Sequence, residues 1–187
     1  LATGVIRLAR MKILVQNIYS LETLAHVDVL CLDKTGTITD GKLKVVSSVP
    51  MMKNAQKEGE KLVRSYLAAS DDNNATFQAL VEAFGAEQIY SPSSKISFSS
   101  KRKWGCISFE EKGSVFVGAP ERLLGQLPDS LEAQLDKGRR VIIIGYYNGL
   151  WTDENRLPEG IRPLYSVILE DTIRNNAQKT LKFFRRE

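Results

Sequence analysis

A short apolar run that ends in an aspartate constrains the fold of this chain most strongly. Residues 24–32 read Leu-Ala-His-Val-Asp-Val-Leu-Cys-Leu and lead directly into Asp33. Such a run predicts a strand that is buried on both faces of a parallel sheet, with Cys31 inside it. In open α/β sheets, ligands and chemistry gather at the carboxyl ends of the strands. Asp33 is therefore predicted to lie where reactive groups collect.

A second apolar run of the same kind lies near the other end of the sequence. Residues 165–169 predict another buried parallel strand. An apolar helix face follows it, formed by Ile173, Ala177, Leu181 and Phe184. The stretch between the two runs is long enough for an independent domain. We therefore predict an α/β domain with a second domain inserted into one of its loops, and hinges at 40–42 and 170–171.

The inserted stretch is predicted to be an α+β domain built on an antiparallel sheet. Its signals are Asn and Gly caps at helix ends, a proline suited to a first helical turn, and alternating strands joined by short turns. The predicted elements are a strand at 43–49, a helix at 56–70, a helix capped by Asn73 or Asn74 and ended by Gly85, a hairpin of 104–109 and 114–117, short helices at Pro120 and around Leu131 and Leu135, and a strand at 141–147.

Composition excludes several classes of protein. The 187 residues are 43% hydrophobic and 26% charged, which fits neither disordered, collagen-like nor membrane-embedded chains. The 26 Lys and Arg against 22 Asp and Glu leave a net charge of +4, too small to argue for nucleic acid. Two cysteines and one histidine cannot complete a four-ligand zinc site, so His26 is predicted to be structural and the compartment reducing.

The first fifteen residues predict neither a membrane span nor a secretory signal. Arg7, Arg10 and Lys12 interrupt the apolar stretch, and no small-residue cleavage site follows. Because the sequence starts with Leu, we expect the chain to have been excised from a longer polypeptide. Taken without further context, the basic spacing fits a basic amphipathic helix with no membrane role.

Residues 33–39 carry the predicted chemistry and read Asp-Lys-Thr-Gly-Thr-Ile-Thr. A carboxylate at a strand end suits an aspartate nucleophile that attacks phosphorus. The hydroxyl and backbone groups of Thr35 and Thr37 can donate to phosphoryl oxygens, Gly36 lets the main chain come close, and Lys34 can offset charge. The alternative is an Asx-type turn that has no catalytic role.

Residues 31–39 resemble the phosphorylation signature of the P-type ATPases, ion pumps of the haloacid-dehalogenase-like superfamily. The resemblance implies that Asp33 takes the γ-phosphoryl group of ATP, with Asp33, Lys34 and Thr35 as catalytic residues. It also implies Mg²⁺ held by the Asp33 carboxylate and the main-chain carbonyl of Thr35. The chain would then lie at the cytoplasmic face of the cell membrane, next to the remaining domains of the same pump.

The residue two positions after the nucleophile favours a pump over a phosphatase. Related soluble hydrolases usually place a second aspartate there, which acts as general acid and base. Here the position is Thr35, whose hydroxyl cannot do this work. An aspartyl phosphate is therefore expected to persist.

By the same resemblance, the inserted domain binds the nucleotide. Phe98 matches the phenylalanine that stacks on adenine, and Lys103 matches a lysine near the bound nucleotide. Gly118 lies in the Gly-Ala-Pro-Glu turn, where a missing side chain gives the nucleotide room. Arg140 aligns with an arginine that reaches the phosphates, with Arg139 as the second candidate.

Several positions depart from the family pattern. Val117 replaces the lysine before the Gly-Ala-Pro-Glu turn, so we expect weaker or differently arranged nucleotide binding. Asn74 stands where many members carry a glutamate beneath the adenine, and it can equally cap a helix. Asp171 and Arg174 match the ends of the family's Asp-Pro-Pro-Arg hinge without its prolines, which predicts a softer hinge. Both are grouped with the nucleotide-binding residues.

The resemblance divides the chain into four segments. Residues 1–26 form a membrane-proximal stalk, and 27–42 form the first part of a Rossmann-like phosphorylation domain. Residues 43–164 form the nucleotide-binding domain, and 165–187 start the second part of the phosphorylation domain. The family's later magnesium-binding acids would follow Glu187, so we predict that the chain binds ATP or ADP without hydrolysing it.

Other functions remain as alternatives. One is a soluble haloacid-dehalogenase-like phosphatase, and another is a non-catalytic nucleotide-binding module. A nucleic-acid binder that uses residues 101–103 ranks last, and we predict no nucleic-acid partner. Ion selection would reside in membrane helices. The sequence has no His-Pro pair of the kind usual in the heavy-metal branch, which favours pumps for hard cations.

Overall fold

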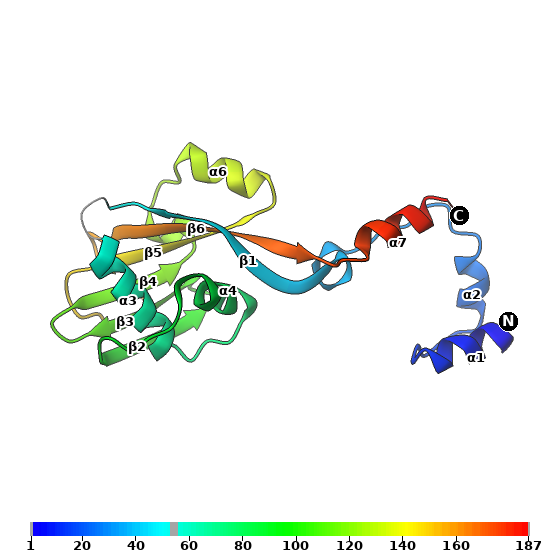
Figure 1. Ribbon diagram of the computed structural model, residues 1–187, viewed down its shortest axis with the longest axis horizontal. Helices are drawn as coiled ribbons and strands as arrows, with labels where there is room; N and C mark the ends of the chain where they lie inside the picture. Colours follow the sequence, from blue (N-terminus) through cyan, green and yellow to red (C-terminus); the bar gives the residue numbers. More distant parts are fainter. Residues whose placement is uncertain (1, 53–55, 187) are drawn as a thin grey trace.

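The computed structural model describes residues 2–52 and 56–186, which form two parts joined by a narrow ribbon (Figure 1). The sheet body holds a six-stranded antiparallel sheet within these residues, in the order β1-β6-β5-β4-β3-β2. The outer part holds residues 2–38 and 174–186 and both chain ends. The strands β1 and β6 run side by side from one part to the other.

The elements follow one another in an α+β order. The outer part begins with α1 (Ala2–Arg10), α2 (Tyr19–Leu24) and a tight loop η1 (Lys34–Ile38), and it ends with α7 (Ala177–Phe184). The strands of the sheet body are β1 (Thr39–Pro50), β2 (Pro92–Ser99), β3 (Trp104–Phe109), β4 (Gly113–Gly118), β5 (Arg140–Tyr147) and β6 (Arg162–Ile173). Its helices are α3 (Gln56–Ala69), α4 (Ala75–Phe84), α5 (Pro120–Leu123) and α6 (Asp129–Asp136).

Hydrophobic clusters cover both faces of the sheet, because side chains alternate along each strand. On one face, Val115 and Val117 of β4 pack with residues of α3 and α4. On the other face, Phe116 of β4 packs with Leu123 of α5 and Leu131 of α6. This burial fixes the register of the strands, since a slip of one residue would turn every buried side chain outward.

Several local signals predicted between residues 43 and 147 are confirmed. Asn74 caps α4, since its Oδ1 accepts a 2.9 Å hydrogen bond from the Phe77 N–H, and Gly85 ends the helix at a φ of 77°. Pro120 occupies the first turn of α5. The hairpin of β3 and β4 also forms, with Gly113 as the first residue of β4 and not part of the connection. The antiparallel α+β domain is therefore as predicted.

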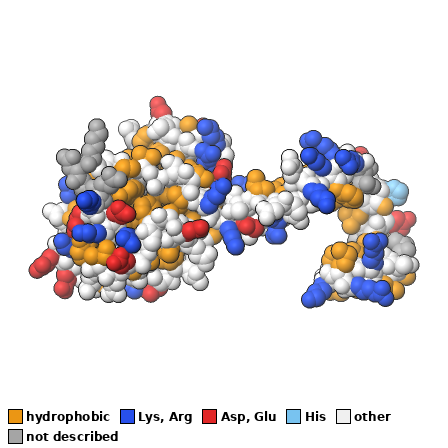
Figure 2. All heavy atoms as spheres, in the orientation of Figure 1, with side chains coloured by type: hydrophobic (Ala, Val, Ile, Leu, Met, Phe, Trp, Pro, Cys, Tyr) orange, Lys and Arg blue, Asp and Glu red, His pale blue; other side chains and the backbone are white. Residues whose placement is uncertain are grey.

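The buried parallel strand predicted at 24–32 is wrong for this structure. The helix α2 ends at Leu24, and residues 25–33 have no regular secondary structure. Val29 is 71% exposed, and Cys31 is exposed instead of buried in a sheet. A strand needs a neighbour for its backbone hydrogen bonds, and β1 and β6 pair with each other instead. Figure 2 shows hydrophobic side chains on the surface of this outer part.

Residues 165–169 do form a buried strand, but its orientation was predicted wrongly. They belong to β6, which pairs antiparallel with both β1 and β5. Helices and loops cover both faces of the sheet, so a central strand is apolar on both sides whatever its direction. The predicted helix face also begins later, because Ile173 is the last residue of β6 and α7 starts at Ala177.

Among the described residues, no helix is both long enough and apolar enough to cross a membrane.

Candidate functional site

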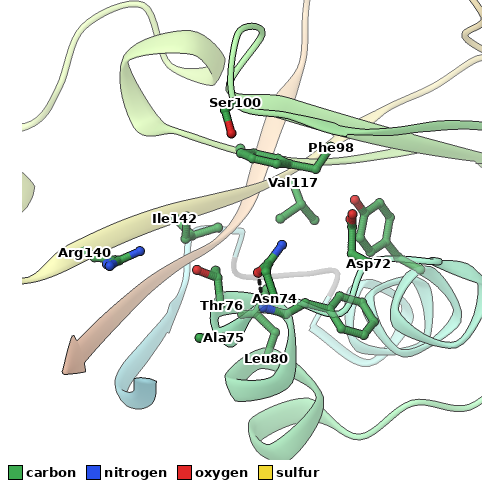
Figure 3. A pocket seen from close by; sticks show the side chains of 13 residues that line it. Asp72, Asn74, Ala75, Thr76, Leu80, Phe98, Ser100, Val117, Arg140 and Ile142 are labelled. Atoms are coloured by element: carbon green, nitrogen blue, oxygen red, sulfur yellow. Dashed lines mark hydrogen bonds between the residues drawn. The ribbon is translucent and has the colours of Figure 1, made fainter. Parts of the chain in front are cut away.

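A cavity of about 520 Å³ opens in the sheet body between the start of α4, the end of β2 and the strands β4 and β5 (Figure 3). Four predicted nucleotide-binding residues line it: Phe98, Asn74, Gly118 and Arg140. They come from separate parts of the sequence, and the sheet brings them together. The cavity also exceeds the lower end of the size range of ordinary ligand sites, about 300 Å³.

Phe98 forms the roof of the cavity. Its ring lies across the cavity from Asn74 and Thr76 in Figure 3, and the residue is 38% exposed. The register of the β2–β3 pairing shifts between Ile96 and Ser99, so the regular pairing of the two strands is interrupted at Phe98. An aromatic face left open beside a cavity can stack on a nucleotide base.

Gly105 supports Phe98 from the neighbouring strand β3, and the sequence alone gave no sign of this role. A Cβ atom at Gly105 would lie 2.9 Å from the Phe98 backbone nitrogen, too close for any side chain. The backbone of β2 can therefore approach β3 closely just where Phe98 projects.

Asn74 and Thr76 form the floor at the start of α4. The Asn74 side chain caps the helix and lines the cavity at the same time. The two interpretations of Asn74, a helix cap and a residue near the nucleotide, are therefore compatible with its place in the fold. Helix starts carry partial positive charge, which favours a polar or anionic ligand nearby.

Val117 and Gly118 of β4 form one wall of the cavity, and Figure 3 shows Val117 between Phe98 and Asn74. A Cβ atom at Gly118 would lie 2.7 Å from both the Lys103 carbonyl oxygen and the Trp104 Cβ. The missing side chain therefore makes room for the neighbouring strand, whereas the sequence suggested that it makes room for a ligand. Val117 stands where the family usually has a lysine, so this wall is apolar.

The structure distinguishes the two candidate arginines at the start of β5. Arg140 lines the cavity and projects toward one end of it in Figure 3. Arg139 turns to the other side, where its Nη1 donates to Gln134 Oε1 at 2.8 Å and its Nε lies 3.5 Å from Glu170 Oε1. Of the two arginines, Arg140 is therefore the one that can contact a ligand in the cavity.

Lys103 lies outside the lining of the cavity. Its Nζ forms an ion pair of 2.9 Å with Glu121 Oε1, and this hydrogen bond lowers the pKa of the Glu121 carboxyl. The Lys103 side chain is half exposed, at 53%. A long flexible side chain at this place can still turn toward the ligand, but the structure pairs it with Glu121.

Asp72 and Tyr66 also line the cavity, although the sequence did not single them out. The Ser70 hydroxyl donates to Asp72 Oδ2 at 3.2 Å, and the Asp72 N–H donates to Ser70 Oγ at 3.2 Å. Burial, and secondarily the Asp72 charge, raise the pKa of the Tyr66 phenol. The run of polar residues before Asn74 was the signal that could have indicated Asp72.

The loop that carries Asp33 lies away from this cavity, at the junction of the ribbon and the outer part (Figure 1). Asp33 is exposed, and the Thr35 N–H donates to its Oδ1 at 3.3 Å, so an Asx-type turn does form. Gly36 has a φ of 78°, which favours glycine at this point. Within the described residues, neither Asp33, Lys34 nor Thr35 lines the cavity.

Asp171 and Arg174 lie at this loop and not at the cavity. Asp171 Oδ2 is 2.9 Å from Lys34 Nζ, and the Arg174 side chain donates to the carbonyl oxygens of Gly36 and Thr39. The structure thus brings together two motifs that are far apart in the sequence.

The predicted donors to a magnesium ion at the loop are the Asp33 carboxylate and the Thr35 main-chain carbonyl. Both are hard oxygen ligands of the kind that Mg²⁺ prefers, so their chemistry fits this ion. In the part of the chain that the structure describes, no group of three or more His, Cys, Asp or Glu side chains could hold a metal.

Known proteins match the chain over nearly its whole length, although a scan against protein-family models gives no match. The probable cation-transporting ATPase exp7 of Streptococcus pneumoniae is 42% identical over 188 residues, which cover 99% of this chain and 24% of that protein. The calcium-transporting ATPase CtpE of Mycobacterium tuberculosis is 34% identical over 189 residues, which cover 98% and 23%. The chain spans about a quarter of the length of these relatives.

Solved structures share the fold. A zinc-transporting PIB-type ATPase in the E2.Pi state matches with a TM-score of 0.61 at 21% identity, over 99% of this chain and 28% of that one. The catalytic domain of the CPx-ATPase CopB-B matches with a TM-score of 0.60 at 15% identity, over 93% and 55%.

These matches confirm the resemblance that the motif 31–39 carried. The chain belongs to the P-type ATPases, and its sheet body has the fold of their nucleotide-binding domain. The relatives that match by sequence are named as cation-transporting ATPases.

Proposed function

We propose that this chain is the ATP-binding and phosphorylation region of a membrane cation pump and acts at the cytoplasmic face of the membrane. ATP binds in the cavity of the sheet body, and its γ-phosphoryl group passes to the Asp33 carboxylate. Mg²⁺ at Asp33 and the Thr35 carbonyl would offset the charge of the phosphates during this transfer.

The observation that carries the proposal is the arrangement of the cavity. Phe98 offers an exposed aromatic face, and Arg140 offers a cation along the same cavity. A purine base can stack on Phe98 while the phosphates extend toward Arg140. Asp33 lies outside the cavity, so the proposal also requires a movement at the ribbon that brings the phosphates to the loop.

Titration of the 187-residue chain with ADP and ATP tests the proposal. We expect both nucleotides to shift the NMR signals of residues around the cavity, in particular Phe98 and Thr76. We expect no phosphate release, because Asp33 and Thr35 offer Mg²⁺ too few oxygen ligands on their own. A chain that shows no nucleotide-dependent shifts at millimolar ADP would refute the proposed binding site.

The transported ion is proposed from the relatives. The mycobacterial relatives are named calcium-transporting ATPases, so Ca²⁺ is the first cation to test for transport. The comparison with zinc-transporting structures rests on 21% identity and concerns the fold alone.

Val117→Lys is expected to tighten nucleotide binding by about threefold to tenfold. The new ammonium would enter the cavity from the wall that β4 forms and attract the electron-rich base and the phosphates. Val46→Lys on β1 is the matched control, because Val46 is 38% exposed and does not line the cavity. Dissociation constants for ADP measure the effect, and an affinity equal to that of the parent chain would contradict the expectation.

Asp72→Asn is expected to reduce the preference for ATP over ITP by about tenfold. A carboxylate only accepts hydrogen bonds, so Asp72 favours a base with an exocyclic amino group over one with a carbonyl there. Asp71→Asn is the control, since Asp71 pairs with Lys95 at 3.2 Å and does not line the cavity. If both variants keep the parent's ratio of ATP to ITP affinity, Asp72 does not distinguish the base of ATP from that of ITP.

A further inference from the structure

We infer that Asp171, near the end of β6, and Arg174, which follows that strand, are positioning residues for the phosphoryl transfer and hold the loop 33–39 in place. The inference rests on the proposed function of Asp33. It assigns to these residues a task other than nucleotide contact, because neither lines the cavity of the sheet body in the described part of the chain.

Arg174 binds the loop through its backbone and its side chain. Its Nη2 donates to the Gly36 carbonyl oxygen at 2.8 Å, and its Nε donates to the Thr39 carbonyl oxygen at 3.0 Å. Its own N–H donates to the Ile38 carbonyl oxygen at 3.0 Å. A planar guanidinium can bridge two carbonyls in a fixed geometry, which an ammonium group cannot do.

Asp171 fixes the loop at its other end through Lys34. Lys34 Nζ lies 2.9 Å from Asp171 Oδ2, and the Asp171 side chain is only 12% exposed. Lys34 is the next residue after Asp33 in the sequence, so this ion pair restrains the backbone beside the nucleophile. A partly buried carboxylate is also screened less by salt than a surface one.

Thr39 connects these contacts to the sheet. It is 1% exposed, and it pairs with Ile173 where β1 meets β6. Its Oγ1 accepts a hydrogen bond of 3.1 Å from the Gly36 N–H and lies 3.4 Å from the Lys34 carbonyl oxygen. The loop is thus held by its hydrogen bond to the buried Thr39 and by its contacts with Asp171 and Arg174.

These contacts matter because little of the loop is buried in the described part of the chain. Residues 33–37 are exposed, and Gly36 permits backbone angles that other residues avoid. The ion pair of Asp171 and the hydrogen bonds of Arg174 therefore restrain the backbone on both sides of the turn that holds the Asp33 carboxylate. A nucleophile that is misplaced by about 1 Å can lose about a hundredfold in rate.

The test separates loop position from nucleotide binding. Asp171→Asn, Asp171→Glu, Arg174→Gln and Arg174→Lys are compared with Glu170→Gln, which removes the neighbouring ion pair to Arg139 and leaves the loop alone. The 187-residue chain gives the dissociation constant for ADP and the amide exchange rate of residues 34–39. The complete pump gives the rate at which radioactive phosphate passes from saturating ATP to the protein.

We expect Asp171→Asn and Arg174→Gln to keep the ADP affinity, to speed amide exchange in the loop, and to slow phosphorylation by about tenfold to a hundredfold. Asp171→Glu should restore most of the rate, and Arg174→Lys only part of it. Equal phosphorylation rates in Asp171→Asn, Arg174→Gln and Glu170→Gln would overturn the inference, as would an ADP affinity that falls with the rate. A parent pump that takes no phosphate would instead refute the proposed function, while loop exchange still reports on these contacts.

Discussion

Asp33→Asn is expected to abolish phosphorylation of the pump by ATP, with less than about a thousandth of the parent's label remaining. A neutral amide cannot serve as the nucleophile toward phosphorus. The substitution keeps the shape of the side chain and its acceptor oxygen for the Thr35 N–H, and Asp33 is exposed. The loss would therefore reflect chemistry and not misfolding. Label from radioactive ATP that is stable in acid and released by hydroxylamine measures the aspartyl phosphate.

Asp40→Asn is the matched control for this experiment. Asp40 follows the same loop, is exposed, and accepts a 2.9 Å hydrogen bond from the Lys42 N–H that an asparagine can keep. This variant should label like the parent. Asp33→Asn in the 187-residue chain should also bind ADP with unchanged affinity, because Asp33 lies outside the cavity. Normal label in the Asp33→Asn pump would mean that another residue is the acceptor.

Features that depend on neighbouring residues were predictable from the sequence. The cap at Asn74, the stop at Gly85 and the proline at the start of α5 each act within one turn of a helix. The hairpin of β3 and β4 likewise depends on a short connection. Phe98, Gly118 and Arg140 could be placed in one site because the family pattern orders them, although their sequence spacing alone says nothing of a shared cavity.

Features that depend on distant partners were not predictable. An apolar run such as 165–169 indicates burial on both faces, but burial does not specify the direction of the neighbouring strands. The run at 24–32 has the composition of a strand but no strand beside it in the described residues. The contacts of Arg174 join residues that are 135 and 138 positions apart, and no local pattern encodes such a pair.

The two interpretations of the motif at 33–39, a local turn and a phosphorylation site, are compatible. Its plain alternative was an Asx-type turn, and the hydrogen bond from the Thr35 N–H to Asp33 forms that turn. The turn leaves the carboxylate exposed at the surface, which a nucleophile requires. A local turn is therefore the means by which the sequence presents Asp33, and it does not argue against a role in phosphoryl transfer.

Phe98→Ala is expected to weaken nucleotide binding by about tenfold to a hundredfold, since stacking of one base on an aromatic side chain contributes about 1–3 kcal/mol. Phe98 is 38% exposed, so its loss should change the free energy of unfolding far less than truncation of a buried phenylalanine. Phe98→Trp should keep most of the affinity, because it keeps the aromatic face. Phe183→Ala is the control, an equal truncation at a 57% exposed position in the outer part.

The pattern across nucleotides makes this test specific. Stacking concerns the base alone, so Phe98→Ala should weaken AMP, ADP and ATP by the same factor. Arg140→Gln should instead weaken ATP more than AMP, because a cation at that end of the cavity acts on the phosphates. Calorimetric titration of the three nucleotides into each variant of the 187-residue chain gives these ratios. If Phe98→Ala left AMP binding intact and weakened only ATP, the base would not lie on Phe98, and the nucleotide would occupy the cavity in another orientation.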